Sequence, residues 1–214
     1  MCSSHGACKR RLGALLLGFM LWAGGPLNAA EPDTAALLAE VRQSFTLNGK
    51  VIPPEIFGDF GDANLADSGN IWVTVDLAAA IDSNLYFDPM RKNGSWQVQR
   101  RQRLKTDTPE ETAYLFCGAT ANGMLVVLAT YNGGGSGTFY TLHLLDVAAA
   151  TAFDDDGKRY QRINLTVLRS VILGDRWEGD VNLSGNDVTV TTTRSGPGSD
   201  GGPRPPRIIK AERP

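Results

Sequence analysis

The sequence is poor in the residues that most enzymes use for catalysis near neutral pH. It contains two histidines and three cysteines in 214 residues, and beyond residue 30 only His143 and Cys117 remain. Sites built from two or more histidines, which include most catalytic zinc sites, are therefore excluded for that part of the chain. A single cysteine cannot form an internal disulfide either, so in an oxidising compartment Cys117 must be buried, pair with another chain or be reactive.

Long apolar runs are also absent beyond the first thirty residues, where no stretch reaches the roughly 18 residues that a membrane-spanning helix needs. The start of the chain combines basic residues at Lys9, Arg10 and Arg11 with an apolar stretch over 12–25 and a small-residue end at Ala30. This pattern is typical of an export signal. We therefore expect residues 1–30 to be a signal peptide and the protein to be soluble and periplasmic or secreted, with no transmembrane segment after cleavage.

An excess of basic residues is missing as well. The chain has 21 Lys and Arg against 23 Asp and Glu, and three of the basic residues fall in the predicted signal peptide. The 184 residues that follow therefore carry a net charge of −5. Because binding to a nucleic-acid backbone depends on many Lys and Arg side chains, we expect no nucleic acid as a partner.

The most informative stretch of the sequence is an apolar region around a glycine cluster. Two apolar runs, over 124–131 and 139–145, flank the glycines at 133–137 and follow a turn signal at Asn122 and Gly123. This arrangement predicts consecutive antiparallel strands. Residues 124–129 show no polar alternation, so we expect a central strand that is covered on both faces.

The remaining pattern predicts a mainly β fold with a short N-terminal helix. Leu37, Leu38, Val41 and Phe45 share one helical face, and Asp33 or Thr34 is available as the N-cap. A small hairpin is expected over 46–52, and residues 55–70 are expected to form an ordered loop. Further strands are expected over 71–77, 85–87 and 96–98 around Asn93-Gly94, 112–117, 160–173, 177–183 and 188–193.

These elements predict an antiparallel sheet arranged as a meander, a sandwich or a barrel. We expect a single β-rich domain over 31–194, followed at 195–214 by a Gly/Pro-rich loop and a C-terminal edge strand or tail. The stretches VDLAAA at 75–80 and LDVAAA at 145–150 resemble each other. They indicate either a duplicated half-domain or two strands that end in the same Asp-capped turn, and we favour the second interpretation.

Two residues are candidates for nucleophilic chemistry. Cys117 ends an apolar run before Gly118, which predicts a buried and inert thiol. His143 alternates with leucines in its expected strand, which predicts a histidine satisfied by a neighbouring hydrogen bond. The alternative is that Cys117 and His143 form a nucleophile and base pair.

Acidic residues offer a second kind of candidate site. Asp59, Asp62 and Asp67 fall in one glycine-bearing stretch and are the candidate ligands of a calcium ion, although their spacing is not that of an EF-hand. No other cofactor is expected. Carboxylates that come together in space would also permit hydrolysis of a glycosidic bond.

The sequence contains one cluster of basic residues, which ends before Asp107. On a hairpin some of them would share a face and bind an anionic partner, such as a component of the cell envelope or an acidic protein. The alternative is a solvated strand whose charges prevent pairing with other strands. The cluster consists of Arg91, Lys92, Arg100, Arg101, Arg103 and Lys105.

The functional prediction follows from these absences and candidates. We expect an exported, non-catalytic binding or cell-envelope-associated protein. The competing hypothesis is a secreted hydrolase that uses carboxylates or Cys117.

Overall fold

The structure is a computed structural model that describes residues 33–58, 73–82, 88–101, 109–194, 196 and 203–213. The predicted signal peptide lies outside these residues. The described chain is mainly β, with antiparallel sheets and a short N-terminal helix, which confirms the predicted fold class. Of the helices in this part of the chain, none has the length and apolar character needed to span a bilayer.

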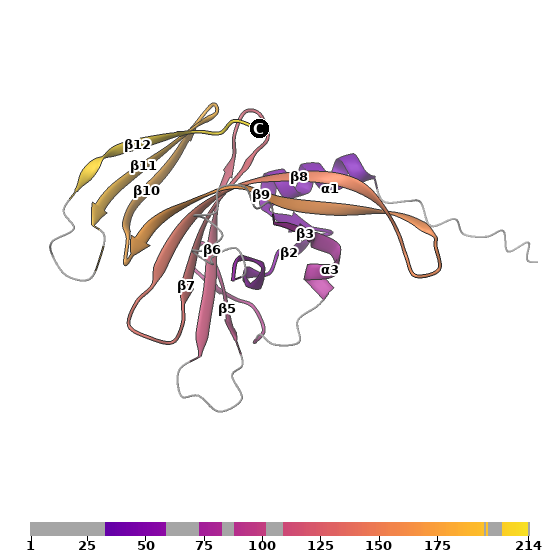
Figure 1. The fold of residues 1–214 in the computed structure, drawn as a ribbon, viewed down its shortest axis with the longest axis horizontal. Helices are drawn as coiled ribbons and strands as arrows, with labels where there is room; N and C mark the ends of the chain where they lie inside the picture. Colours follow the sequence, from indigo (N-terminus) through magenta and orange to yellow (C-terminus); the bar gives the residue numbers. More distant parts are fainter. Residues whose placement is uncertain are drawn as a thin grey trace, which may run out of the picture. The chain divides into compact units, whose positions relative to one another are not determined.

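The largest element is a seven-stranded antiparallel sheet in the order β3-β9-β8-β7-β6-β5-β4 (Figure 1). Consecutive strands from β4 to β9 lie side by side as a meander, and β3 pairs with β9 at the edge. The strands are β3 (Thr74–Asp76), β4 (Arg91–Asn93), β5 (Trp96–Arg101), β6 (Glu110–Ala119), β7 (Leu125–Asn132), β8 (Phe139–Phe153) and β9 (Arg159–Asp175).

Strand β7 lies at the centre of this sheet and is buried on both faces. Leu125, Val127 and Ala129 belong to one hydrophobic core, which we call the first core. The residues between them, Val126 and Leu128, belong to a second core on the opposite face. The predicted central strand without polar alternation is therefore confirmed, because both of its faces lie against apolar layers.

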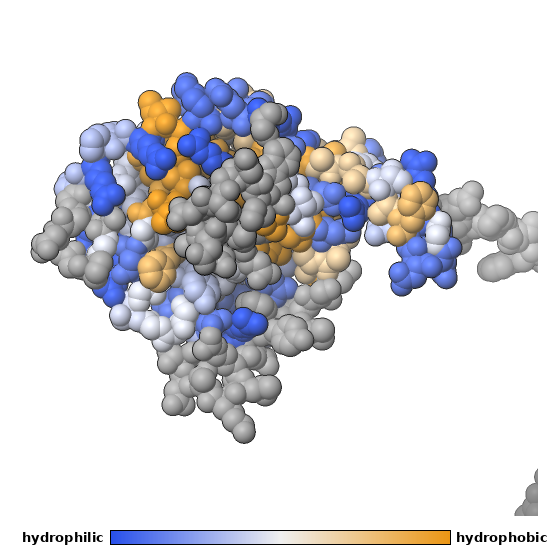
Figure 2. All heavy atoms as spheres, viewed as in Figure 1, coloured by the Kyte–Doolittle hydropathy of each residue, from blue (hydrophilic) through white to orange (hydrophobic). Residues whose placement is uncertain are grey.

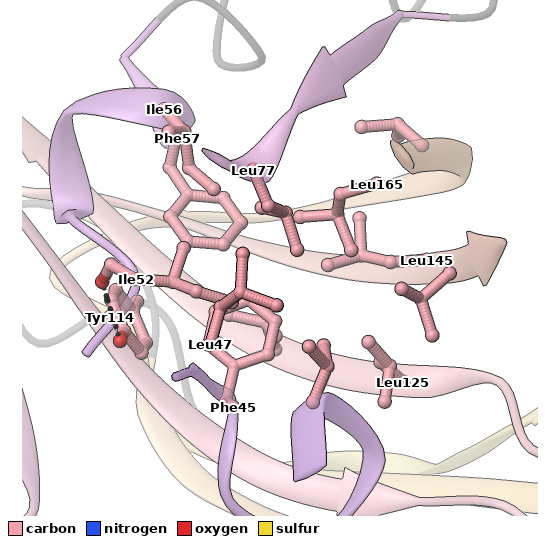
Figure 3. Close-up of a cluster of buried hydrophobic side chains, with 14 of the residues drawn as sticks. Phe45, Leu47, Ile52, Ile56, Phe57, Leu77, Tyr114, Leu125, Leu145 and Leu165 are labelled. Atoms are coloured by element: carbon pink, nitrogen blue, oxygen red, sulfur yellow. Dashed lines mark hydrogen bonds between the residues drawn. The ribbon is translucent and has the colours of Figure 1, made fainter. Parts of the chain in front are cut away.

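The first core is covered by the N-terminal part of the chain. Helix α1 begins after Asp33, whose side chain accepts a hydrogen bond from the Ala35 N–H at 3.0 Å, so the predicted N-cap is confirmed. Figure 3 shows Phe45 and Phe57 projecting into this core from outside the sheet. The covering elements are α1 (Thr34–Ser44), β1 (Thr46–Leu47), β2 (Lys50–Val51), the 3₁₀-helix η1 (Pro54–Phe57) and α3 (Leu77–Asp82).

One buried hydrogen bond fixes this cover to the sheet. The hydroxyl of Tyr114 on β6 donates to the carbonyl oxygen of Ile52 at 2.8 Å, as drawn in Figure 3. The Tyr114 ring also contacts Phe45 edge-on, with 5.2 Å between ring centroids. Because a buried hydroxyl needs a partner, this bond sets the position of the segment that leads into η1.

The second core is covered by a three-stranded antiparallel sheet in the order β10-β11-β12. Its strands are β10 (Glu178–Ser184), β11 (Asp187–Arg194) and β12 (Arg204–Lys210), so Ile208 and Ile209 pair with β11. Figure 2 shows hydrophobic residues gathered among hydrophilic ones in the part of the view where these strands lie.

The turn at Asn122 ties the two sheets together. The Asn122 N–H donates to the side-chain oxygen of Asn186, and its side-chain amide donates to the carbonyl oxygen of Ala211 at 2.7 Å. The turn before β7 therefore contacts both the β10–β11 turn and the residue after β12. The predicted turn at Asn122-Gly123 is confirmed, with Gly123 at a φ of +81°.

Two local predictions are wrong. The sequence predicted a wide-looped hairpin between strands at 85–87, which lie outside the described residues, and 96–98. Instead β5 pairs with β4 through the two-residue turn Gly94-Ser95, because Asn93 pairs directly with Trp96. The residues predicted as the start of a loop at position 55 instead form η1, which begins after Pro53. Proline is favoured in the first turn of a helix, which explains why η1 begins at this position. The loop prediction did not take this preference into account.

The two Asp-Ala-rich stretches do not share a local structure. The first ends a strand and enters α3, where the side chain of Asp76 accepts a hydrogen bond from the Ala78 N–H at 3.1 Å. The second continues through Ala150 to Phe153 as part of β8. Residues 145–150 pair with β9 along their whole length, and this pairing outweighs the local preference for a turn. The interpretation as two capped turns is therefore wrong for residues 145–150.

Gly179 is a position where only glycine fits. A methyl group there would overlap the carbonyl oxygen of Thr191 and approach the Trp177 ring at 2.7 Å. We expect Gly179→Ala to lower the free energy of unfolding by about 3 kcal/mol, because backbone must move to relieve the overlap. Urea denaturation checks this, with Gly135→Ala as the control because a methyl group there meets nothing within 4 Å. Equal stability of the two variants would contradict the tight packing at β10.

Candidate functional site

A pocket of about 250 Å³ opens on the face of the large sheet that carries the first core. Three strands and one helix form its walls, and no charged side chain is among the described residues that line it. The lining residues are Phe57 from η1, Ala129, Thr130 and Tyr131 from β7, Phe139, Thr141 and His143 from β8, and Ile172 from β9.

The sheet register explains why these residues meet. Ala129, Thr141 and Ile172 are cross-strand partners on β7, β8 and β9, so their side chains form one row across the sheet. His143 lies two residues further along β8, on the same face as Thr141. Phe57 covers this end of the row from η1, with its ring centroid 5.5 Å from that of His143. Residues far apart in the sequence therefore enclose a single apolar space.

The pocket becomes more exposed toward its mouth. His143 is fully buried, whereas Tyr131, Phe139 and Ile172 are 37%, 53% and 53% exposed. Tyr131 and Phe139 are cross-strand partners at the end of the β7–β8 hairpin, directly before the glycine-rich turn. Large apolar side chains left in solvent at the rim of a hollow are a common feature of ligand-binding surfaces.

His143 is the polar group at the deep end of the pocket. Its Nδ1 atom lies 2.9 Å from the hydroxyl of Ser170, the residue directly opposite on β9. This contact confirms the prediction of a strand histidine satisfied by a neighbour. Desolvation by complete burial lowers the pKa of His143 to about 4, so the imidazole is neutral at physiological pH.

Cys117 lies on the other side of the large sheet from His143. It packs against the second core, whereas His143 is stacked on Phe57 of the first core. The structure therefore does not bring the two residues together as a nucleophile and base. Burial raises the pKa of the Cys117 thiol to about 11, which disfavours the reactive thiolate.

The basic cluster is divided between the two faces of the sheet. Arg100 pairs with Glu111 at 2.9 Å, and Arg101 pairs with Glu110 at 3.5 Å. Because neighbouring residues of a strand point to opposite faces, Arg100 and Arg101 do not share a surface. Lys92 is exposed on β4 and lies on the same face as Arg101, whereas Arg91 lies on that of Arg100.

The other members of the basic cluster, Arg103 and Lys105, lie outside the described residues. The anion-binding surface formed by the cluster therefore stays a prediction. The proposed calcium ligands Asp59, Asp62 and Asp67 also lie outside them, and so does their site. Within the described ranges, no three His, Cys, Asp or Glu side chains are grouped as metal ligands would be.

Comparisons with protein-family models, with curated proteins and with solved structures find no significant match to this chain. The candidate site therefore rests on the geometry of the pocket itself.

Sequence reasoning identified only one member of the pocket, His143. The other seven lining residues are ordinary strand or helix positions that become a site only through the register of β7, β8 and β9 and the cover of η1. One signal was available in the sequence, because Tyr131 and Phe139 flank the glycine-rich turn symmetrically. Aromatic residues at both ends of a hairpin turn are cross-strand neighbours, which was sufficient to expect an exposed aromatic pair.

The state of Cys117 can be tested by thiol labelling. Because the thiol is shielded by the second core and its pKa is raised, we expect Cys117 of the native protein to react with a disulfide reagent at pH 8 at least about 100-fold more slowly than in urea. Absorbance of the released chromophore measures both rates, after removal of the predicted signal peptide with its two cysteines. Similar rates in the two states would show that Cys117 is accessible and would revive the nucleophile hypothesis.

Burial of His143 also predicts a pH dependence of stability. The pKa of His143 is about 4 in the folded chain and near 6.5 when unfolded, so the unfolded state binds a proton first as the pH falls. The stabilisation is complete above pH 6.5 and is lost between pH 6.5 and pH 4, by up to about 3 kcal/mol. Urea unfolding of the wild type and of His143→Leu across this range measures it.

The comparison with His143→Leu separates this effect from that of the carboxylates. Both proteins lose stability as carboxylates are protonated, but only the wild type carries the additional loss from His143. We therefore expect the stability difference between the two proteins to change with pH over this window. A difference that stays constant from pH 6.5 to pH 4 would show that His143 titrates normally.

Proposed function

We propose that this chain is an exported, non-catalytic protein that binds a small uncharged apolar ligand in the pocket between η1 and strands β7 to β9. The observation that carries the proposal is the composition of the pocket, whose described lining residues are mainly aromatic and aliphatic and include no charged side chain. The export part of the proposal is supported by the signal-like pattern of residues 1–30.

The size and polarity of the pocket restrict the ligand. A volume of about 250 Å³ exceeds the roughly 150 Å³ that accommodates a single benzene ring, so a molecule of two fused or linked rings, or a short branched chain, fits. The neutral imidazole of His143 and the hydroxyl of Thr141 supply the polar groups within reach of the enclosed space. A ligand with one hydroxyl or carbonyl group at its buried end is therefore favoured over a charged one.

The rim of the pocket supports the same proposal. Phe139 and Ile172 expose more than half of their side-chain surface on two neighbouring strands, and Tyr131 stands beside them on β7. Covering these side chains with a ligand removes apolar surface from water and favours binding by roughly 25 cal/mol per Å². Without a ligand, the apolar surface of these three side chains stays in contact with water.

The proposal is tested with N-phenyl-1-naphthylamine, a neutral aromatic probe whose fluorescence rises in apolar surroundings. Titrating the protein into a fixed low concentration of probe should give a saturable increase, with a dissociation constant on the order of 0.1 mM for a ligand of this size. Thr141→Phe places a ring inside the pocket and should weaken binding at least about tenfold, which corresponds to 1.4 kcal/mol.

The matched control is Thr189→Phe on β11. Thr189 alternates with Val188 and Val190 of the second core, so its side chain points away from that core and lies far from the pocket in the fold. We expect Thr189→Phe to bind the probe as the wild type does. If Thr141→Phe does not fold, Ile172→Asp places a charge at the exposed rim instead and should weaken binding in the same way. Unchanged binding by a folded pocket variant would reject the proposal.

A further inference from the structure

Strands β8 and β9 run on past the rest of the large sheet as a two-stranded ribbon. Strand β7 pairs with β8 only up to Leu145, whereas β8 and β9 continue to pair as far as Phe153 and Arg159. Figure 1 shows this ribbon extending beyond the other labelled strands to a hairpin turn. The outer edge of β8 over residues 148–153, which we call the ribbon edge, has no strand beside it in the described chain.

Two hydrogen bonds reveal which backbone groups of the ribbon edge face outward. The Asp154 N–H donates across the ribbon to the carbonyl oxygen of Lys158, so the even-numbered positions bond to β9. The carbonyl oxygen of Val147 accepts from the Arg42 guanidinium at 3.1 Å, on the opposite side. Because backbone direction alternates along a strand, the N–H and C=O groups of Ala149, Thr151 and Phe153 point outward.

The ribbon edge lacks the features that normally prevent strands from pairing. Its sequence, AATAF after Ala148, contains no charged residue, glycine or proline. The other outer strands of the described sheets differ in this respect: β4 carries Arg91 and Lys92, β10 carries Glu178 and Asp180, and β12 carries two prolines, two arginines and a lysine, while β1 and β2 have two residues each and β3 has three. Charges, prolines and short length are how natural sheets protect their edges.

We propose that the ribbon edge is an interaction surface for a second copy of this chain, paired antiparallel about a twofold axis at Thr151. In this register the two Thr151 residues face each other, and Ala149 lies opposite Phe153 of the second copy. All three outward-facing residues then exchange backbone hydrogen bonds. The carbonyl oxygen of Val147 takes no part in this pairing and keeps its hydrogen bond from Arg42.

The side chains of the ribbon edge fit this arrangement. Phe153 is 67% exposed and would lie across Ala149 of the second copy, where a small side chain leaves room for the ring. Ala149 and Thr151 are themselves exposed, so no described side chain has to be displaced. The pairing therefore covers the most exposed large apolar side chain that the structure describes.

Charge complementarity supports an antiparallel self-pairing over other occupants. The acidic turn Asp154-Asp155-Asp156 lies at the tip of the ribbon edge, whereas Arg42 and Arg213 lie together at its base beside Gly123. Antiparallel pairing places the acidic turn of one copy next to the two arginines of the other, of which Arg213 already pairs with Asp146 of its own chain at 2.9 Å. The Arg42 guanidinium, which donates to the carbonyl oxygen of Val147 at 3.1 Å, supplies the positive charge that such a turn meets at the base of the ribbon edge.

The experiment is sedimentation equilibrium of the chain without its predicted signal peptide, from about 1 to 200 µM. We expect a reversible dimer that becomes monomeric when Thr151→Pro removes the outward N–H group at the twofold axis. The matched control is Gln161→Pro. Gln161 is the cross-strand partner of Thr151 and carries the equivalent outward N–H on the opposite edge of the same ribbon, so this variant should dimerise as the wild type does.

A second variant tests the register and does not depend on a proline. Thr151→Cys should form a disulfide-linked dimer on mild oxidation, whereas Gln161→Cys should remain monomeric on a non-reducing gel, since Cys117 is partly buried against the second core in both. A wild type that is monomeric throughout, a dimer that survives Thr151→Pro, or equal cross-linking of the two cysteine variants would each overturn the proposal.

Discussion

The burial of strand β7 on both faces is the constraint on which the rest of the structure depends. A strand without polar alternation cannot lie at a surface, so each face needs its own apolar cover. The chain meets this requirement with two unrelated covers, the helices α1, η1 and α3 with the hairpin β1-β2 on one face and the sheet β10-β11-β12 on the other. The turn at Asn122 then joins β7 to the second cover through hydrogen bonds to Asn186 and Ala211.

The elements that could be predicted from the sequence are those with a local cause. Residues 124–129 indicated a central strand, Asp33 indicated a helix start, and Asn48-Gly49 indicated a hairpin turn, and each of these is confirmed. The wrong predictions share a different cause. The alanine triplet at 148–150 is ambiguous by itself, and pairing with β9, a property of residues more than ten positions away, makes it a strand.

The candidate site was less predictable than the fold, for a related physical reason. His143 could be recognised because a polar residue in an apolar strand needs a partner, and Ser170 supplies it. The pocket around His143 exists because η1 covers the sheet incompletely. Phe57 packs on His143, whereas Ile172 stays exposed. The glycine-rich turn indicates the register of β7 and β8, but neither the register of β9 nor the placement of η1 over the sheet has a signature in the local sequence.

The unequal lengths of the central strands account for both unusual surfaces of the molecule. Strand β7 has eight residues, whereas β8 has 15 and β9 has 17, so the longer pair must project beyond its neighbours. At the end near Phe139, η1 and the exposed side chains of β7 to β9 enclose the pocket. At the end near Phe153, β8 and β9 pair with each other and with no other strand of the described chain. Since the pocket and the ribbon edge lie at opposite ends of one strand pair, the proposed pairing of two ribbon edges would leave both pocket mouths open to solvent, and the proposed ligand binding would not compete with self-association.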